Sequence, residues 1–594
     1  MQNTLLTVLL QLAVIACMCQ SKETLLVRAN IGKPAEYMRQ VRIFYQLNKR
    51  NTVEREDRYS FEERGETTKT GGERFSLEAK TIKPDLKMKE GPPAIVSIQT
   101  KINNKMIDDG GPDPMVAVGE KTILVGNTSW LKFFDKSNGN VLEETDLTSL
   151  FWRYLSPTIP GTSQPNPDFA TNFYDLPNDI PLACTKSTPC GVSECPNGGY
   201  DDNDLPCGET DAIIENAGRI TIGYDLRVFY QKEHKRFVIV AAIRNQSSAH
   251  NDCYNIDGKI DCKKYVIRLA AFAVSVSENP ADGFYIYRTT ENNVRDWPNL
   301  AVDQDYLVLS YKGGNASTNG KSVVTVFSFR QMKDGAGPSV DAFRIKQNDE
   351  TDAPKGVTPV QNLLTNQYSQ AFFFIENAGS EKIRIWYLKK PAVAADIFKN
   401  PPTQLVKAGE ITIADAEFTG GAFAGATYYD NMLYTVSYQK MYPASGTKRI
   451  GYGLNVFQIP VVEQASGGYK AWKNISQGFK HSIFKSESHS FRNPSIAVDL
   501  LHNIVIQFVR IPRDSTSSEF PNIRYKVKLS HRPDWEYSQL AKSWDARHNE
   551  TKKLVDFSWV AKDPFKLTHF WQSHIYKANG KTGTWVTQID LGKF

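Results

Sequence analysis

Carboxylates recur in this sequence at one kind of place, beside short polar turns between apolar runs. Two carboxylates held about 5–10 Å apart could cleave a glycosidic bond, one as acid and the other as base or nucleophile. Catalytic residues would break a repeat, whereas these aspartates follow it, and an aspartate accepts hydrogen bonds from its own local backbone. We therefore predict a turn role, and assign no catalytic residue, among Asp113, Asp225, Asp303, Asp430, Asp499 and Asp556.

A short run of oxygen donors offers a metal site. Asp201, Asp202 and Asp204 surround Asn203, and side-chain oxygens of this kind are calcium ligands. The run lacks the glycine and the final glutamate that an EF-hand loop requires. Calcium at these three aspartates is one hypothesis, a solvated acidic loop is the other, and no further cofactor is expected.

The histidines and the short catalytic motifs indicate no other reaction. The sequence contains no H-E-x-x-H, no G-x-S-x-G, no P-loop and no dinucleotide fingerprint. His569 and His574 lie five positions apart on a predicted strand, so they would face opposite sides of it. We interpret both as structural.

Six cysteines beyond the N-terminal region predict disulfides in an oxidising compartment. Cys253 and Cys262 enclose Asp257-Gly258, a dipeptide that favours a type I′ hairpin turn. Counting outward pairs 256 with 259, 255 with 260 and 254 with 261. The two cysteines then meet at a non-hydrogen-bonded position, where side chains approach closely enough for a disulfide. The pairing of the other four cysteines stays open, and they are Cys184, Cys190, Cys195 and Cys207. A zinc site is the alternative for these four, although no C-x-x-C is present.

Residues 1–19 have the character of a secretory signal peptide. The uncharged run Leu5–Cys17 is too short to cross a bilayer and long enough for a signal h-region. Val14–Cys17 also looks like a lipobox that would place a lipid on Cys17, although no Lys or Arg precedes it. We predict a secreted, extracellular chain without a transmembrane segment. In a eukaryotic source its sequons would carry glycans, at Asn127, Asn245, Asn315, Asn474 and Asn549.

Composition indicates a folded, β-rich protein. Of the 594 residues, 41% are hydrophobic and 11% aromatic, which is enough for a large core and favours strands. The net charge of +6 is a small excess over 65 acidic side chains and gives no reason to expect a nucleic-acid partner.

The chain divides into a charged extension or linker at 20–90 and a repetitive region at 91–594. One phrase recurs there before an apolar run, as DPMVAVG from 113, WPNLAVD from 297 and NPSIAVD from 493. A strand, a tight turn and a second strand form the inner hairpin of a propeller blade. We predict an all-β fold with a single β-propeller of about seven four-stranded blades, and a pair of β-sandwiches is the alternative. The blades fall near 112–145, 220–290, 296–345, 356–408, 420–463, 488–540 and 554–594, with a disulfide-rich insertion at 146–219 and a closing strand at 95–101.

Longer versions of these phrases, such as YDLRVFYQKEHKRFVIVAA and NPSIAVDLLHNIVIQFVR, resemble large secreted β-propeller proteins that are common in bacteria and mostly uncharacterised. The resemblance covers about residues 110–594. It implies the fold and secretion, and it implies no particular activity.

Sialidases share the propeller architecture, but their Asp box, S-x-D-x-G-x-x-W, is absent. The nearest approach is Asn579–Trp585, with Asn for Asp and a different spacing. A sialidase also grips a carboxylate with three arginines. Arg227, Arg295 and Arg492 stand near the starts of inner strands, a loose condition that chance meets easily.

The function that we expect is therefore non-enzymatic binding of an extracellular carbohydrate, matrix polymer or protein, as in an extracellular-matrix component. A glycoside hydrolase or lyase-like enzyme that uses carboxylates on the propeller face is the alternative. Two facing carboxylates would favour the enzyme, and a channel filled by apolar side chains would favour binding.

Overall fold

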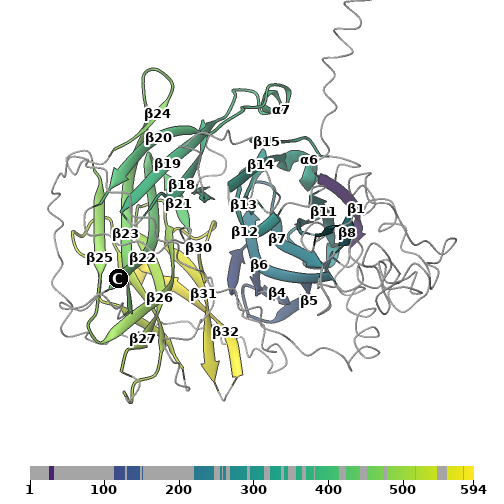
Figure 1. Ribbon diagram of the computed structural model, residues 1–594. Helices are drawn as coiled ribbons and strands as arrows, with labels where there is room; N and C mark the ends of the chain where they lie inside the picture. Colours follow the sequence, from purple (N-terminus) through teal and green to yellow (C-terminus); the bar gives the residue numbers. More distant parts are fainter. Residues whose placement is uncertain are drawn as a thin grey trace, which may run out of the picture.

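Seven antiparallel sheets follow one another along the chain and close into a ring, so the protein is a seven-bladed β-propeller (Figure 1). The predicted all-β fold is confirmed. The structure is a computed structural model that describes residues 26–32, 113–127, 130–147, 150–151, 220–245, 254–256, 259–261, 268–289, 294–313, 322–335, 340–345, 356–363, 370–379, 381–413, 423, 425–441, 451–472, 478–514, 517–544, 558–578 and 581–593.

Each blade runs from an inner strand near the ring axis to an outer edge. Blades 1 to 3 contain β2 (Met115–Val118), β3 (Thr122–Gly126), β4 (Trp130–Asp135) and β5 (Val141–Asp146); β6 (Ile220–Gln231), β7 (Arg236–Asn245), β10 (Arg268–Ser275) and β11 (Phe284–Thr289); and β12 (Val294–Val302), β13 (Tyr306–Gly313), β14 (Ser322–Ser328) and β15 (Ala342–Ile345). Blade 4 contains β16 (Val357–Pro359), β18 (Ala371–Asn377), β19 (Lys382–Lys389) and β20 (Val406–Thr412).

The remaining blades complete the ring. Blades 5 to 7 contain β21 (Ala426–Tyr429), β22 (Met432–Met441), β23 (Gly451–Glu463) and β25 (Lys480–Phe484); β26 (His489–Val498), β27 (Ile504–Pro512), β28 (Asn522–Lys528) and β29 (Gln539–Ser543); and β30 (Trp559–Lys562), β31 (His569–Ala578) and β32 (Lys581–Asp590). Short elements beside the blades are β1 (Leu26–Gly32), β8 (Tyr254–Ile256), β9 (Lys259–Asp261), β17 (Gln361–Asn362), β24 (Tyr469–Ala471), α6 (Phe329–Lys333), α7 (Asp396–Lys399), η2 (Pro280–Asp282) and η4 (Leu591–Lys593).

The predicted blade limits agree with the sheets except in blade 5. Its outer strand β25 lies beyond the predicted limit at 463, because the long strand β23 pairs first with β25 and then, at its far end, with β24. The extension at 20–90 contributes β1, which pairs with β11 as a fifth strand of blade 2.

In two of the three recurring phrases the proline lies in a bulge of the inner strand. Pro298 and Pro494 stand inside these bulges, where a residue without an N–H costs no ladder hydrogen bond. Asp225 and Asn493, with φ of 60° and 48°, adopt the left-handed backbone that the kink requires. One extra residue relative to the partner strand enters between Tyr224 and Arg227, Asp296 and Asn299, and Arg492 and Ser495.

Apolar side chains fill the space between successive blades. Phe272 of blade 2 meets Phe327 of blade 3 with ring centres 5.3 Å apart, and both rings are fully buried. Between the last blade and the first, Trp571 packs in one cluster with Val116 and Ile123. Because one sheet cannot cover both of its faces, the core is a ring of such layers.

The hairpin that carries the predicted disulfide has the predicted register. Tyr254 pairs with Asp261, Asn255 with Ile260, and Ile256 with Lys259. Cys253 and Cys262 themselves lie outside the described residues, as do residues 1–19, the cysteines at 184–207 and Asp201, Asp202 and Asp204. In the part of the chain that the structure describes, no helix has the length and apolar character to cross a membrane.

Candidate functional site

The recurring aspartates build turns at the end of the inner strands. Asp303 Oδ1 accepts hydrogen bonds from the backbone N–H groups of Asp305 and Tyr306, each at 2.8 Å. Asp499 Oδ1 accepts from the N–H groups of Leu501 and Asn503, each at 2.9 Å. These bonds give Asp303 and Asp499 the predicted turn role.

Two further aspartates act through their backbone. Asp430 and Asn431, with φ of 48° and 59°, form the two-residue turn between β21 and β22. Asp225 occupies the bulge of β6 described above. Asp113 is buried just before β2, and Asp556 lies outside the described residues.

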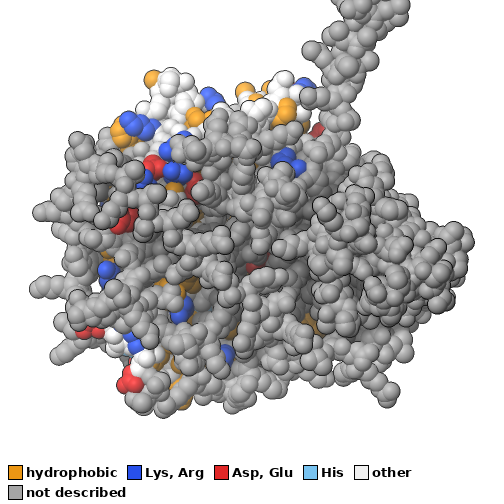
Figure 2. Space-filling view, viewed as in Figure 1, with side chains coloured by type: hydrophobic (Ala, Val, Ile, Leu, Met, Phe, Trp, Pro, Cys, Tyr) orange, Lys and Arg blue, Asp and Glu red, His pale blue; other side chains and the backbone are white. Residues whose placement is uncertain are grey.

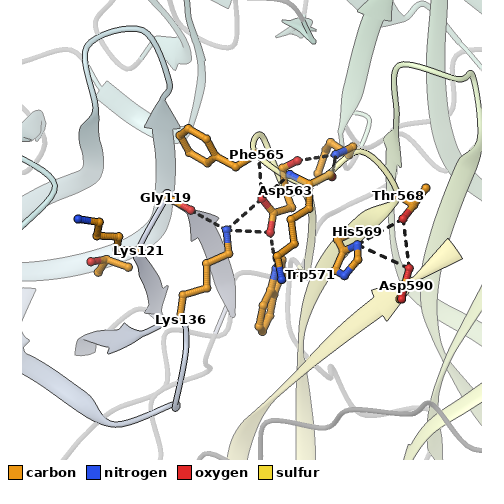
Figure 3. Close-up of polar contacts among 12 residues, drawn as sticks. Gly119, Lys121, Lys136, Asp563, Phe565, Thr568, His569, Trp571 and Asp590 are labelled. Atoms are coloured by element: carbon orange, nitrogen blue, oxygen red, sulfur yellow. Dashed lines mark hydrogen bonds and ion pairs between the residues drawn. The ribbon is translucent and has the colours of Figure 1, made fainter. Parts of the chain in front are cut away.

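Asp563, which the sequence analysis did not single out, is the most heavily used aspartate of this kind. Its Oδ1 accepts from the N–H groups of Phe565 and Lys566 at 3.0 and 3.2 Å, and its Oδ2 accepts from the Trp571 indole at 3.3 Å. Lys136 of blade 1 adds an ammonium group 3.0 Å from Oδ1 and 2.8 Å from Oδ2 (Figure 3). The Asp563 side chain is fully buried, so this ion pair joins blade 7 to blade 1 out of contact with water.

The same junction recurs between blades 3 and 4. Lys390 directly follows the third strand of blade 4, as Lys136 follows the third strand of blade 1, and its Nζ lies 2.6 Å from Asp303 Oδ2. Both side chains are nearly buried, with 5% and 7% exposure. A lysine of the following blade therefore docks on the turn aspartate of the preceding blade at two places in the ring.

Blade 1 uses the opposite arrangement. Gly119 stands where blades 3, 6 and 7 have their turn aspartate, and the carboxylate comes from Glu278 of blade 2 instead. Glu278 Oε1 accepts from the N–H groups of Lys121 and Thr122 at 2.6 and 3.1 Å. A Cβ at Gly119 would lie 2.4 Å from that oxygen, so the position must be glycine while Glu278 occupies the site.

Lysines gather around an exposed aromatic ring where the turns of blades 7, 1 and 2 meet. Phe565 is 37% exposed, and the Nζ atoms of Lys136 and Lys232 lie 5.6 and 5.4 Å from its ring centre. Figure 3 shows Phe565 beside the Lys136–Asp563 ion pair. Tyr230 of blade 2 packs against the same ring at 6.1 Å. We call this surface, with Lys121, Lys562, Lys566 and Leu567, the lysine junction.

Lys562 of the lysine junction is surrounded by both positive and negative charges. Burial lowers its pKa to about 8, and the positive charges of Lys232 and Lys136 act in the same direction, against Asp563 and Asp499. Its ammonium group donates to the backbone carbonyls of Asp563 and Lys566. Within the described residues, no acidic side chain forms an ion pair with Lys121, Lys232, Lys562 or Lys566.

Two aromatic side chains near the lysine junction extend into the propeller channel. Trp559 of blade 7 meets Phe229 of blade 2 with ring centres 6.3 Å apart, although blade 1 separates these blades around the ring. The indole also approaches Gly425, before the inner strand of blade 5, since a Cβ there would lie 3.6 Å from it. Inner strands of non-neighbouring blades meet only across the axis, so these two side chains reach into the channel, where both are half-buried.

The arginines weighed for a sialidase site are tied to the walls. Arg227, 3% exposed, donates from Nε and Nη2 to Asn299 Oδ1 at 3.3 and 3.2 Å and thereby links blades 2 and 3. The Arg492 guanidinium lies 4.0 Å from the centre of the Tyr452 ring. The side chain of Arg295 is outside the described part of the chain.

A second polar network lies in blade 6, between the start of β26 and the loop that joins β27 to β28. Ser488 Oγ and Glu519 Oε2 each lie 2.8 Å from His489, at Nδ1 and Nε2 respectively. Arg510 and Asn522 also contact Glu519, the latter by donating to Oε1 at 3.1 Å. Burial lowers the pKa of His489, against the opposing effect of the Glu519 hydrogen bond. The network fixes the loops before β26 and after β27, and no spacing of these residues along the chain predicts it.

A surface hollow of about 830 Å³ lies beside α7 on blade 4, and includes Lys389, Asp396 and Asn400 in its wall. In Figure 2, hydrophobic and basic side chains gather near the top, over α7 and β24. Lys390 also lines this hollow, but its charge is paired with Asp303. The hollow therefore offers a ligand fewer unpaired charges than the lysine junction does.

Few of the predicted binding residues fall in described positions. Asn127 Oδ1 accepts from the N–H of Trp130 at 2.8 Å, which orders the start of β4. The other four sequons have side chains outside the described part of the chain, at Asn245, Asn315, Asn474 and Asn549. Among the side chains that are described, no group of three His, Cys, Asp or Glu residues could hold a metal ion.

The two histidines of β31 face opposite sides of the sheet, as predicted. His569 lies opposite Asp590, with Nδ1 3.6 Å from its Oδ1, whereas His574 is fully buried. Burial lowers the pKa of His574 to about 4. Burial also lowers the pKa of His481, which stacks on Phe457 at 4.6 Å, to about 4, with a smaller effect from Lys485.

Acid should therefore destabilise the fold through His481 and His574. Both are neutral when folded, whereas in the unfolded chain each binds a proton below about pH 6.5. Their contribution is complete above that pH and is lost as the pH falls toward 4, at up to about 1.4 kcal/mol per pH unit for each histidine. Denaturant titrations at pH 7 and pH 5 should show a smaller acid-induced loss in His481→Gln than in the unmodified protein. An equal loss in both would contradict this assignment.

No family model and no curated protein matches this chain. Among solved structures it is similar to an endo-arabinase from Bacteroides thetaiotaomicron, with 13% identity, a TM-score of 0.27, and coverage of 50% of this chain and 95% of that one. It is also similar to the intramolecular trans-sialidase from Ruminococcus gnavus, with 7% identity, a TM-score of 0.35, and coverage of 69% and 92%. An α-L-arabinofuranosidase from Fusarium graminearum has 11% identity, a TM-score of 0.33, and coverage of 62% and 93%. At this level of similarity the comparisons carry no argument on function.

Proposed function

We propose that the protein is a secreted, non-enzymatic propeller that binds an extracellular carbohydrate at the lysine junction. The observation that carries the proposal is the exposed ring of Phe565 with the ammonium groups of Lys136 and Lys232 beside it. The C–H face of a sugar can lie on an aromatic ring, while neighbouring ammonium groups bond its oxygens. An exposed ring of this kind suits binding at a surface better than catalysis in an enclosed pocket.

The turn geometry supports a preformed site. The N–H of Phe565 is bonded to Asp563, and its ring is flanked by Tyr230, Lys136 and Lys232. A ring that is already fixed loses little conformational freedom when a ligand binds. Secretion, the glycans on the sequons and calcium at Asp201, Asp202 and Asp204 belong to the same proposal, since they fit an extracellular matrix component.

A glycan array on the purified protein tests this function, with Phe565→Ala as the key variant. We expect glycan binding, and an affinity at least about tenfold lower in the variant, which corresponds to about 1.4 kcal/mol. Phe520→Ala is the matched control, because Phe520 is 39% exposed on the loop between β27 and β28. Its affinity should be unchanged.

Mass spectrometry of the glycans after incubation separates binding from turnover. Unchanged glycans support the proposal, whereas cleaved products would overturn it in favour of the hydrolase or lyase alternative. Equal loss of binding in the Phe565 and Phe520 variants would show that the lysine junction is not the site.

A further inference from the structure

The lysine junction has a surplus of positive charge that the fold does not use. Lys136 is neutralised by Asp563, and Lys235 by Glu120 at 2.5 Å. Two further carboxylates are engaged elsewhere, since Glu278 is bonded to the backbone of the turn and Glu233 to the side chain of Gln231. Lys121, Lys232, Lys562 and Lys566 are left, and among the described residues none of these four has an acidic partner.

These lysines stand on the turns of blades 1, 2 and 7 that meet beside Phe565. The Nζ atoms of Lys136 and Lys232 both lie within 6 Å of the Phe565 ring centre, on side chains from different blades. Lys562 and Lys566 stand in the same turn as Phe565, and the Lys562 ammonium reaches the Lys566 carbonyl. Burial lowers the pKa of the Lys562 ammonium group, and the positive charges of Lys232 and Lys136 add a smaller effect in the same direction.

Lysines beside an aromatic ring define the chemistry of the ligand. A neutral sugar would leave the surplus charge unbalanced, whereas a sugar with an anionic substituent would neutralise it. The anion meets ammonium groups while the sugar ring lies on Phe565, and Leu567, 50% exposed, extends the apolar part.

We propose that the lysine junction selects polyanionic glycans, whose sulfate or carboxylate groups contact Lys121, Lys232 and Lys566. This inference rests on the proposed carbohydrate binding and names the class of carbohydrate. The ring of Phe565 provides the contact common to all sugars, and the three exposed lysines provide the preference for charge.

Binding of dextran and dextran sulfate, two polymers that share one backbone, tests the inference in the full chain. We expect the sulfated polymer to bind at least tenfold more tightly than dextran, with an affinity that falls as salt rises because salt screens exposed charges. The triple variant Lys121→Gln, Lys232→Gln and Lys566→Gln should lose this preference. A matched variant, Lys399→Gln, Lys470→Gln and Lys480→Gln, removes three exposed lysines from α7, β24 and β25 and should keep it.

Two further arms identify the anion and the role of the sugar. Polygalacturonate in place of dextran sulfate shows whether carboxylates serve as well as sulfates, and binding of either supports the inference. A single-stranded oligonucleotide that bound as tightly as dextran sulfate and polygalacturonate would overturn the inference, because negative charge alone would then be sufficient for binding. Thermal melting of each variant checks that the fold is intact.

The failure of this inference is distinguishable from the failure of the proposed function. If the triple variant binds dextran sulfate as the unmodified protein does, the inference is wrong, even where Phe565→Ala abolishes binding of every glycan. If Phe565→Ala changes nothing and no glycan binds at all, carbohydrate binding itself is wrong.

Discussion

Replacing Lys136 by Met should lower the free energy of unfolding by about 3–5 kcal/mol. The substitution keeps much of the side-chain volume but leaves the fully buried carboxylate of Asp563 without its cation, and an unpaired buried charge is costly. Denaturant unfolding of the variant at pH 7 measures the loss. The second change Asp563→Asn, made in the same chain, should recover part of it, because it removes the stranded charge and keeps an oxygen for the turn hydrogen bonds.

Two other lysines calibrate this result. Lys390→Met should cost a similar amount, because Lys390 and Asp303 form the equivalent buried pair. Lys399→Met should cost less than about 1 kcal/mol, because Lys399 and Asp396 are 70% and 43% exposed. If Lys136→Met were as mild as Lys399→Met, the ion pair would not be what holds blade 7 to blade 1.

Introducing a side chain at Gly119 should have the second large effect. In Gly119→Ala, the new Cβ would lie 2.4 Å from Glu278 Oε1 and 3.0 Å from the Thr122 carbonyl, so the carboxylate must move away from the turn. Overpacking of this kind costs about 1–3 kcal/mol. Glu278→Ala alone should also destabilise the protein, because the N–H groups of Lys121 and Thr122 lose their acceptor.

The double variant Gly119→Asp, Glu278→Ala tests the idea behind this prediction. It gives blade 1 the turn aspartate that blades 3, 6 and 7 already have, and vacates the space that the new side chain needs. We expect the double variant to be more stable than the sum of the single changes by about 0.5–3 kcal/mol. Simple additivity would mean that Glu278 does not replace the aspartate.

The sequence was sufficient for the fold because the signal is local and repeated. The phrase with proline before Ala-Val-Asp predicts an inner strand, its turn and the next strand, and all three appear where Asp303 and Asp499 stand. Blade 5 was harder, since β21 and β22 join through Asp430 and Asn431 without the phrase, and its outer strand follows a second hairpin.

The candidate site was not predictable in the same way. Lys136, Lys232 and Phe565 are far apart in sequence and carry no spacing signal, because their proximity depends on blades 1, 2 and 7 meeting in the closed ring. The missing aspartate of blade 1 was visible as Gly119 within the phrase. Its replacement by Glu278 was not, since that residue belongs to another blade.

The ion pair between Lys136 and Asp563 joins residues 427 positions apart. An extended loop of this length loses much chain entropy on closing, and contacts of such high sequence separation slow folding. Blade 1 can therefore complete its packing only after blade 7 has been made. Until then, the face of blade 1 that carries Val116 and Ile123 and packs against Trp571 stays uncovered. Apolar surface that stays uncovered during synthesis is prone to aggregation, so this face of blade 1 is a surface on which a chaperone would act.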